Sequence, residues 1–291
     1  MFFALCLASM LAYSLQGTLM AGLYRRLDPQ EAITVRGLCL ALVMLPLLAF
    51  VPAEAFVRLP HYAAIIVLAA GFAALGAWCN ARAFRFLPVG LTIAFMTTFN
   101  TLLICLWGFL AFQEALNWVQ GLVIAAILSC VVGLGVSRSR VALGQVAHPH
   151  KGLLLCLIYG LCISLAFTLL SHVARKLNPF LAAYCWETLI GLISFGITVM
   201  RKTIARRPVF SISRRDTATI LLFCSPTLIG TGAYMLAVTL GPVSIVAAVN
   251  TAVIVISTIL ARIFFKEKAA LLQWTLLLLI CALLVALHLA S

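Results

Sequence analysis

The chain has 291 residues, of which 65% are apolar and 9% charged, and its mean hydropathy is +1.18. A soluble domain is about 45–50% apolar and about 25% charged, so these values exclude a soluble enzyme, a disordered protein and a nucleic-acid-binding domain. The net charge of +13 does not change this conclusion, because the Lys and Arg residues lie in short clusters between long apolar runs, as the positive-inside rule produces. We expect a membrane protein without a nucleic-acid partner.

Ten segments of the sequence are long and apolar enough to cross about 30 Å of hydrocarbon, which takes roughly 20 residues. Prolines or short polar stretches separate them, and Pro52 and Pro60 are each expected to mark a helix end. The segments are 2–24, 31–52, 62–86, 89–111, 117–136, 152–174, 180–200, 217–240, 243–264 and 269–289. The expected fold is all-α, a polytopic bundle of ten transmembrane helices.

The two halves of the chain share one layout. Similar short motifs recur at offsets of about 150 residues in the pairs Asp28-Pro29 and Asn178-Pro179, Leu87-Pro88-Val89 and Gly241-Pro242-Val243, Phe112-Gln113-Glu114 and Phe265-Lys266-Glu267, and Gln120 and Gln273. We therefore predict two repeats, residues 1–140 and 150–291, each with five spans. Because five is odd, the repeats must be inverted, and inverted repeats point to a substrate path at the bilayer midplane.

The ten cysteines all lie within apolar segments, and none forms a CxxC motif or a Cys/His cluster with zinc-ligand spacing. We interpret them as packing residues and expect neither a metal site nor a cofactor.

Orientation can be predicted from the basic residues. Seventeen of the twenty Lys and Arg residues fall in the odd-numbered connections or the adjoining helix ends. By the positive-inside rule these connections are cytoplasmic and both termini lie outside.

Ionisable side chains within the spans are the first candidates for function. Glu187 lies some eight residues into the seventh segment, and Arg36 lies at the matching depth of the second, while Arg82 is near the end of the third. Two interpretations remain open. Glu187 and Arg36 could form a structural ion pair, or Arg36 could extend to the interface. Alternatively, Arg36 or Arg82 binds an anionic substrate group and Glu187 a cationic one, with Glu187 as proton carrier.

The chain resembles the ten-helix EamA-type transporters of the drug/metabolite transporter superfamily. The resemblance covers almost the whole length and rests on Leu27-Asp28-Pro29 with Arg36, Leu87-Pro88-Val89, Glu114 with Gln120-Gly121, Pro242-Val243-Ser244, and Phe265-Lys266-Glu267 with Gln273-Trp274. The family often has a proline in the middle of the fourth and ninth helices, where this chain has Asn100 and Ile254, so the kinks there could be altered. Studied members are thought to have cytoplasmic termini, opposite to the charge prediction.

The resemblance implies a central cavity built largely by the third, fourth, eighth and ninth helices. On this basis Asn80, Asn100, Tyr234 and Asn250 are candidate substrate-binding residues, although each could simply hydrogen-bond to a neighbouring helix. Trp186 could stack on a substrate ring or belong to the core.

The function expected is secondary transport of a small organic metabolite, an amino acid or related amphipathic compound, by alternating access, with proton-coupled export as an option. The alternative is a lipid translocase that opens laterally. An enzyme is not expected, because HExxH and comparable polar clusters are missing from the sequence. We expect a monomer, since one chain contains both repeats. We expect its location to be the cell inner membrane.

Overall fold

The computed structural model describes residues 1–114, 117–142, 148–206, 208–266 and 270–290, with the side chains of 135–142 left out. Within this part of the chain all regular structure is helical. The elements are α1 (Phe2–Arg26), α2 (Pro29–Val43), the 3₁₀ helix η1 (Leu45–Phe50), α3 (Ala53–Phe86), α4 (Val89–Phe112), α5 (Trp118–Ala142), α6 (Pro149–Lys176), α7 (Pro179–Ile204), α8 (Arg214–Cys224), α9 (Thr227–Leu240), α10 (Val243–Asn250), α11 (Val253–Phe265) and α12 (Leu271–Leu289).

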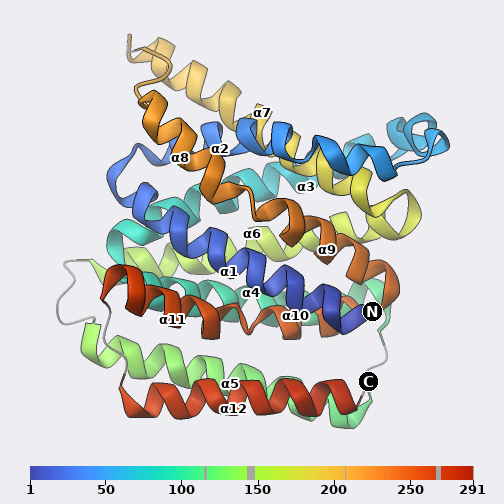
Figure 1. Ribbon diagram of the computed structural model, residues 1–291, viewed down its shortest axis with the longest axis vertical. Coiled ribbons are helices and arrows are strands. Elements are labelled where there is room, and N and C mark those ends of the chain that lie inside the picture. Colours follow the sequence, from blue (N-terminus) through green and yellow to red (C-terminus); the bar gives the residue numbers. More distant parts are fainter. Residues whose placement is uncertain (115–116, 143–147, 207, 267–269, 291) are drawn as a thin grey trace.

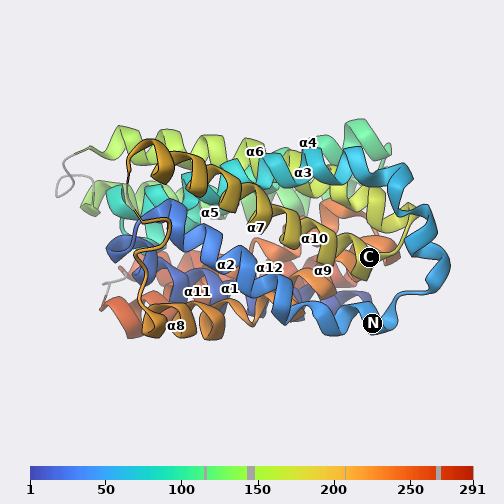
Figure 2. The same ribbon diagram turned by 90° about the horizontal axis from the view of Figure 1, so that it is seen from above.

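The helices lie side by side in an elongated bundle, and both termini are at the same end (Figure 1). α5 and α12 pack against each other at one edge of the bundle, while α2, α7 and α8 lie at the opposite edge (Figures 1 and 2). Among the described residues, eight segments are long and apolar enough to cross a membrane, and α5 adds the shorter apolar helix Trp118–Leu134. The all-α membrane fold is confirmed, and the count of ten spans stays a prediction.

Several spans are interrupted, and not always at the predicted place. α2 gives way to η1 around Pro46, and Ser225-Pro226 separate α8 from α9. The helix end expected at Pro60 is wrong, because α3 begins at Ala53 and continues through Pro60. The carbonyl that Pro60 leaves without its usual donor belongs to Phe56, which is 43% exposed at the helix end, where polar groups can satisfy it.

The kinks expected to be altered by missing prolines behave differently in the two repeats. α4 runs unbroken through Asn100. Its counterpart is divided into α10 and α11 at Thr251-Ala252, just before Ile254. Tight turns close the break, with the N–H of Ile254 donating to the carbonyl of Thr251 at 3.1 Å and the N–H of Val255 to that of Ala252 at 2.9 Å. The helix is therefore interrupted without a proline.

Matched helix caps make the two repeats visible. The side chain of Asp28 accepts from the backbone N–H groups of Gln30 and Glu31 at the start of α2. The side chain of Asn178 accepts in the same way from the two corresponding N–H groups at the start of α7. The residue that follows α4, Gln113, has a left-handed backbone with φ 52°, and the residue that follows α11, Lys266, has φ 54°. The partner motif residue Glu267 lies outside the described residues.

Two arginines make matching contacts in the two repeats. Arg25 donates to the carbonyls of Phe84 and Leu87 at the end of α3 and lies over the ring of Phe265. Its counterpart Arg175 donates to the carbonyls of Val238 and Gly241 at the end of α9 and lies over the ring of Phe112. α1 and α6 run in opposite directions (Figure 1), so the two-repeat architecture is confirmed and the repeats are inverted.

α2 and α7, which are equivalent helices, cross at two glycines. A Cβ atom on Gly37 would lie 2.3 Å from the Cα of Gly191, and one on Gly191 would lie 2.7 Å from the carbonyl carbon of Gly37. Small residues let helices within a membrane approach until their backbones touch. This crossing also brings the neighbouring Arg36 of α2 close to Glu187 of α7.

Replacing Gly37 by alanine is expected to lower the thermal stability of the protein, because the new methyl group would meet backbone atoms, which move only with their helix. The cost should be at the upper end of the range of about 1–3 kcal/mol for an overpacked core. Gly71→Ala in α3 is the matched control, since a Cβ there meets nothing within 4 Å. Equal melting temperatures for the two variants would contradict the close crossing.

Candidate functional site

A central cavity of about 190 Å³ lies between the two repeats. Residues of α1, α2, α3 and α4 line it from the first repeat, and residues of α6, α7, α9, α10 and α11 from the second. Its lining includes Tyr24 and Phe84, in the last turns of α1 and α3, and Ile93 near the start of α4. The cavity therefore extends from the middle of the bundle toward the end opposite the two termini.

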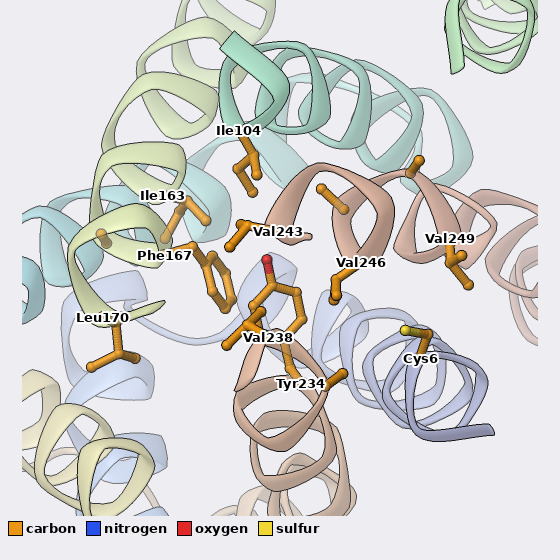
Figure 3. Packing of buried hydrophobic residues seen from close by; sticks show 14 of the residues in the cluster. Cys6, Ile104, Ile163, Phe167, Leu170, Tyr234, Val238, Val243, Val246 and Val249 are labelled. Carbon is orange, nitrogen blue, oxygen red and sulfur yellow. The ribbon is translucent and has the colours of Figure 1, made fainter. Parts of the chain in front are cut away.

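A buried apolar cluster fills the bundle on the side of the two termini. Cys6, Leu170, Val238 and Val243 belong to it and are buried near the helix ends on the side of the termini. Figure 3 shows Tyr234 and Phe167 at the centre of this packing. The ring centroids of Phe167 and Tyr234 are 4.6 Å apart, and those of Phe167 and Trp186 are 5.0 Å apart.

Seven of the eight candidate residues from the sequence come together in the cavity lining. They are Arg36, Asn80, Asn100, Trp186, Glu187, Tyr234 and Asn250. The eighth, Arg82, is exposed and lies over the ring of Trp78, 4.9 Å from its centroid, outside the cavity lining. We therefore do not include Arg82 in the proposed site.

The sequence interpretation missed several polar residues of the lining, among them Tyr13, Tyr24, Thr101 and Ser257. A signal existed on α1, because Tyr13, Gly17 and Tyr24 lie four and seven residues apart and so share one face of a helix. Ser257 carries no comparable signal, because isolated hydroxyl groups are common in transmembrane helices.

Arg36 and Glu187 form a loose ion pair at the α2–α7 crossing. Arg36 Nη2 and Glu187 Oε2 are 3.6 Å apart, and the side chains are 11% and 3% exposed. Charge-assisted hydrogen bonds measure about 2.7–2.9 Å, so this pair is held by charge more than by hydrogen bonding. Arg36 Nε and Glu187 Oε2 are buried without a hydrogen-bond partner. Both groups therefore retain unused hydrogen-bonding capacity.

A second buried ion pair provides a contrast. Glu114, between α4 and α5, accepts from Arg175 at 3.0 Å, from the N–H groups of Val243 and Ser244 at 2.7 and 3.0 Å, and from the Ser244 hydroxyl at 2.8 Å. Both carboxylate oxygens are engaged, and they cap the start of α10. Glu114 has the environment of a structural ion pair, and Glu187 does not.

Five further polar atoms of the lining are buried without a hydrogen-bond partner. They are Asn80 Oδ1, Asn100 Oδ1, Trp186 Nε1, Tyr234 Oη and Ser257 Oγ. A buried polar group left unpaired costs about 1–3 kcal/mol. A molecule that hydrogen-bonds to these atoms would remove this cost, and its binding would be favoured. Asn250 differs, since its side chain donates to the carbonyl of Val246 and accepts from Ser9.

The residues that line the cavity include one basic and one acidic side chain, Arg36 on α2 and Glu187 on α7. The rest of the lining is made of uncharged polar, aromatic and apolar residues.

Ion pairs connect the two repeats at the end where α1 joins α2. Arg26 binds Asp216 and Arg201 binds Asp28, both at 2.8 Å, and Lys202 binds the fully buried Glu31. Burial raises the pKa of Asp28, but hydrogen bonds from Arg201 and the backbone of Glu31 and Gln30 lower it, and the net shift is downward. The stability contributed by Asp28 is present at neutral pH and is lost as the pH falls into the acid range.

Glu187→Gln is expected to lower the melting temperature clearly less than Glu114→Gln does. Removing one partner of a well-bonded buried ion pair costs about 3–5 kcal/mol, and Glu114 has four partners at hydrogen-bond distance. Glu187 has one, Thr231. Thermal unfolding of the purified variants measures the difference. Equal losses of stability would favour the structural interpretation of the Arg36–Glu187 pair.

Comparison with known proteins identifies the family. The model of the EamA-like transporter family matches residues 2–136 and 150–287. A solved structure described only as the crystal structure of a protein superposes with a TM-score of 0.70, at 16% identity, over 99% of this chain and 94% of that one. At this identity the likeness shows the fold alone. No curated protein matches the chain. The chain, a multi-pass integral membrane protein, belongs to the EamA-like transporter family, whose members are membrane transporters of small solutes.

Proposed function

We propose that the protein is a secondary transporter that moves a small zwitterionic metabolite, such as an amino acid or a related amphipathic compound, by alternating access between its two repeats. The observation that carries this proposal is the Arg36–Glu187 pair in the central cavity. Each partner comes from one repeat, and each retains unused hydrogen-bonding capacity.

The chemistry of the lining suits such a solute. The guanidinium of Arg36 can bind a carboxylate, and the carboxylate of Glu187 can bind an ammonium group. The rings of Phe167, Trp186 and Tyr234 offer an apolar surface for the side chain of the solute. Because a zwitterion supplies both charges at once, it can bind between Arg36 and Glu187 without leaving either charge unpaired.

Glu187 is also the group we propose for proton coupling. It is the one acidic residue among the residues that line the cavity. Protonation would remove its charge and so weaken its attraction for both Arg36 and an ammonium group. A proton and the solute would then compete for the same carboxylate, which supports proton-coupled export as the working mechanism.

The wider setting follows from the same proposal. Because both repeats are present in one chain, a monomer is sufficient for function, and we propose the cell inner membrane as its location. Small solutes and the lipid bilayer are the proposed partners, and we propose no enzymatic activity. Apolar packing fills the bundle on the side of the termini, and we propose that this arrangement is one state of an alternating-access cycle.

A thermal-stability screen against amino acids, amines, nucleosides and sugars tests the proposed substrate class. A compound that binds the folded protein raises its melting temperature by mass action. We expect a zwitterionic class to stabilise the native protein, and Glu187→Gln and Arg36→Gln to lose that shift. Arg82→Gln should keep it, since Arg82 lies outside the cavity lining.

The outcomes separate the alternatives. Glu187→Gln keeping every ligand-induced shift would refute the role of Glu187 in solute binding and direct the search to Asn80, Asn100 and Tyr234. Movement of headgroup-labelled lipid by the protein in liposomes, without any shift from the small compounds, would support the lipid translocase instead.

A further inference from the structure

Thr231 on α9 holds one oxygen of the Glu187 carboxylate. Its Oγ1 donates to Glu187 Oε1 at 3.2 Å, and both side chains are buried. The hydroxyl of Tyr13 on α1 lies 2.9 Å from the same Oγ1. Tyr13, Thr231 and Glu187 therefore form a chain of hydrogen bonds, and Tyr13 and Glu187 at its two ends both line the cavity.

The direction of this chain follows from counting hydrogens. A threonine hydroxyl has one hydrogen and can accept as well as donate. Because Thr231 donates its hydrogen to Glu187, it can only accept from Tyr13. The Tyr13 hydroxyl thus donates to Thr231, which donates to Glu187. A chain of this kind polarises each donor and strengthens the hydrogen bond that reaches the carboxylate.

Close packing of Tyr13 against α9 holds this chain of hydrogen bonds in place. Gly230 precedes Thr231, and a Cβ atom there would lie 3.2 Å from ring carbons of Tyr13. The absence of a side chain at Gly230 lets the Tyr13 ring lie directly against α9. Engaging Oε1 in this way leaves Oε2 as the unpartnered oxygen, 3.6 Å from Arg36.

We propose that Thr231 and Tyr13 are positioning residues for Glu187, which hold Oε1 so that Oε2 stays available beside Arg36 for the positive group of the solute. This inference rests on the proposed function only for the use made of Oε2. The hydrogen bond between Tyr13 and Thr231 joins the first repeat to the second, and the ion pair between Glu187 and Arg36 joins them again. Binding of a positive group at Glu187 Oε2 would therefore alter the hydrogen bond between Tyr13 of α1 and Thr231 of α9.

Infrared difference spectroscopy of the purified full-length protein tests the proposal without a known solute. Subtracting the spectrum of Glu187→Gln isolates the carboxyl bands of Glu187, whose frequencies depend on hydrogen bonding. We expect Thr231→Val to shift these bands and Thr231→Ser, which keeps the hydroxyl, to restore them. Tyr13→Phe should shift them in the same direction by less, because it removes only the second hydrogen bond.

Thr239→Val is the matched control. Thr239 is on the same helix, its hydroxyl donates to the carbonyl of Leu236 at 2.7 Å, and it does not line the cavity, so the bands should not move. Glu187 bands in Thr231→Val that coincide with those of the unmodified protein would overturn the inference. If the bands shift as expected but Glu187→Gln keeps all ligand-induced melting shifts, the positioning role stands and the proposed function fails.

Discussion

A buried pair of opposite charges, Arg36 and Glu187, is the interaction on which the organisation of this protein depends. A single charge within the hydrocarbon layer is costly, and a partner or water must compensate it. The two residues come from different repeats, so their pairing requires α2 and α7 to stay close. Gly37 and Gly191 make this possible, because their lack of side chains lets the two backbones touch at the crossing.

The way each ion pair is bonded separates scaffold from site. At Glu114 every oxygen has a partner, and the carboxylate fastens the start of α10 to α6 through Arg175. At Glu187 the hydroxyl of Thr231 engages one oxygen, while the other faces Arg36 beyond hydrogen-bond distance. An ion pair with a purely structural role is most stable in the first arrangement, because all its polar atoms are hydrogen-bonded. The second leaves room for a solute between the two charges.

Much of this arrangement could be predicted from the sequence. Length and hydropathy predict the helices, and the spacing of Asp28-Pro29 and Asn178-Pro179 predicts the repeats, because both signals arise from local chemistry. Depth within a span identifies Glu187 and Arg36 as candidates, with an ion pair between them as one of the open interpretations. The direction of a side chain around its helix is harder to predict. Arg82 lies two residues after Asn80, about 200° further round the helix, which places one in the lining and the other on the exposed face.

Other features depend on contacts that no local pattern encodes. The break at Thr251-Ala252 occurs without proline or glycine, and the role of Thr231 depends on α9 packing against both α1 and α7. Pro60 is tolerated because it lies near the N-terminal end of the long helix α3.

The most direct test of a solute site between Arg36 and Glu187 is flux in proteoliposomes loaded with a mixture of radiolabelled amino acids. We predict efflux by the unmodified protein and by Arg82→Gln, and its loss in Arg36→Gln and Glu187→Gln under conditions where all four proteins are folded. Equal efflux by Glu187→Gln and the unmodified protein would contradict this account.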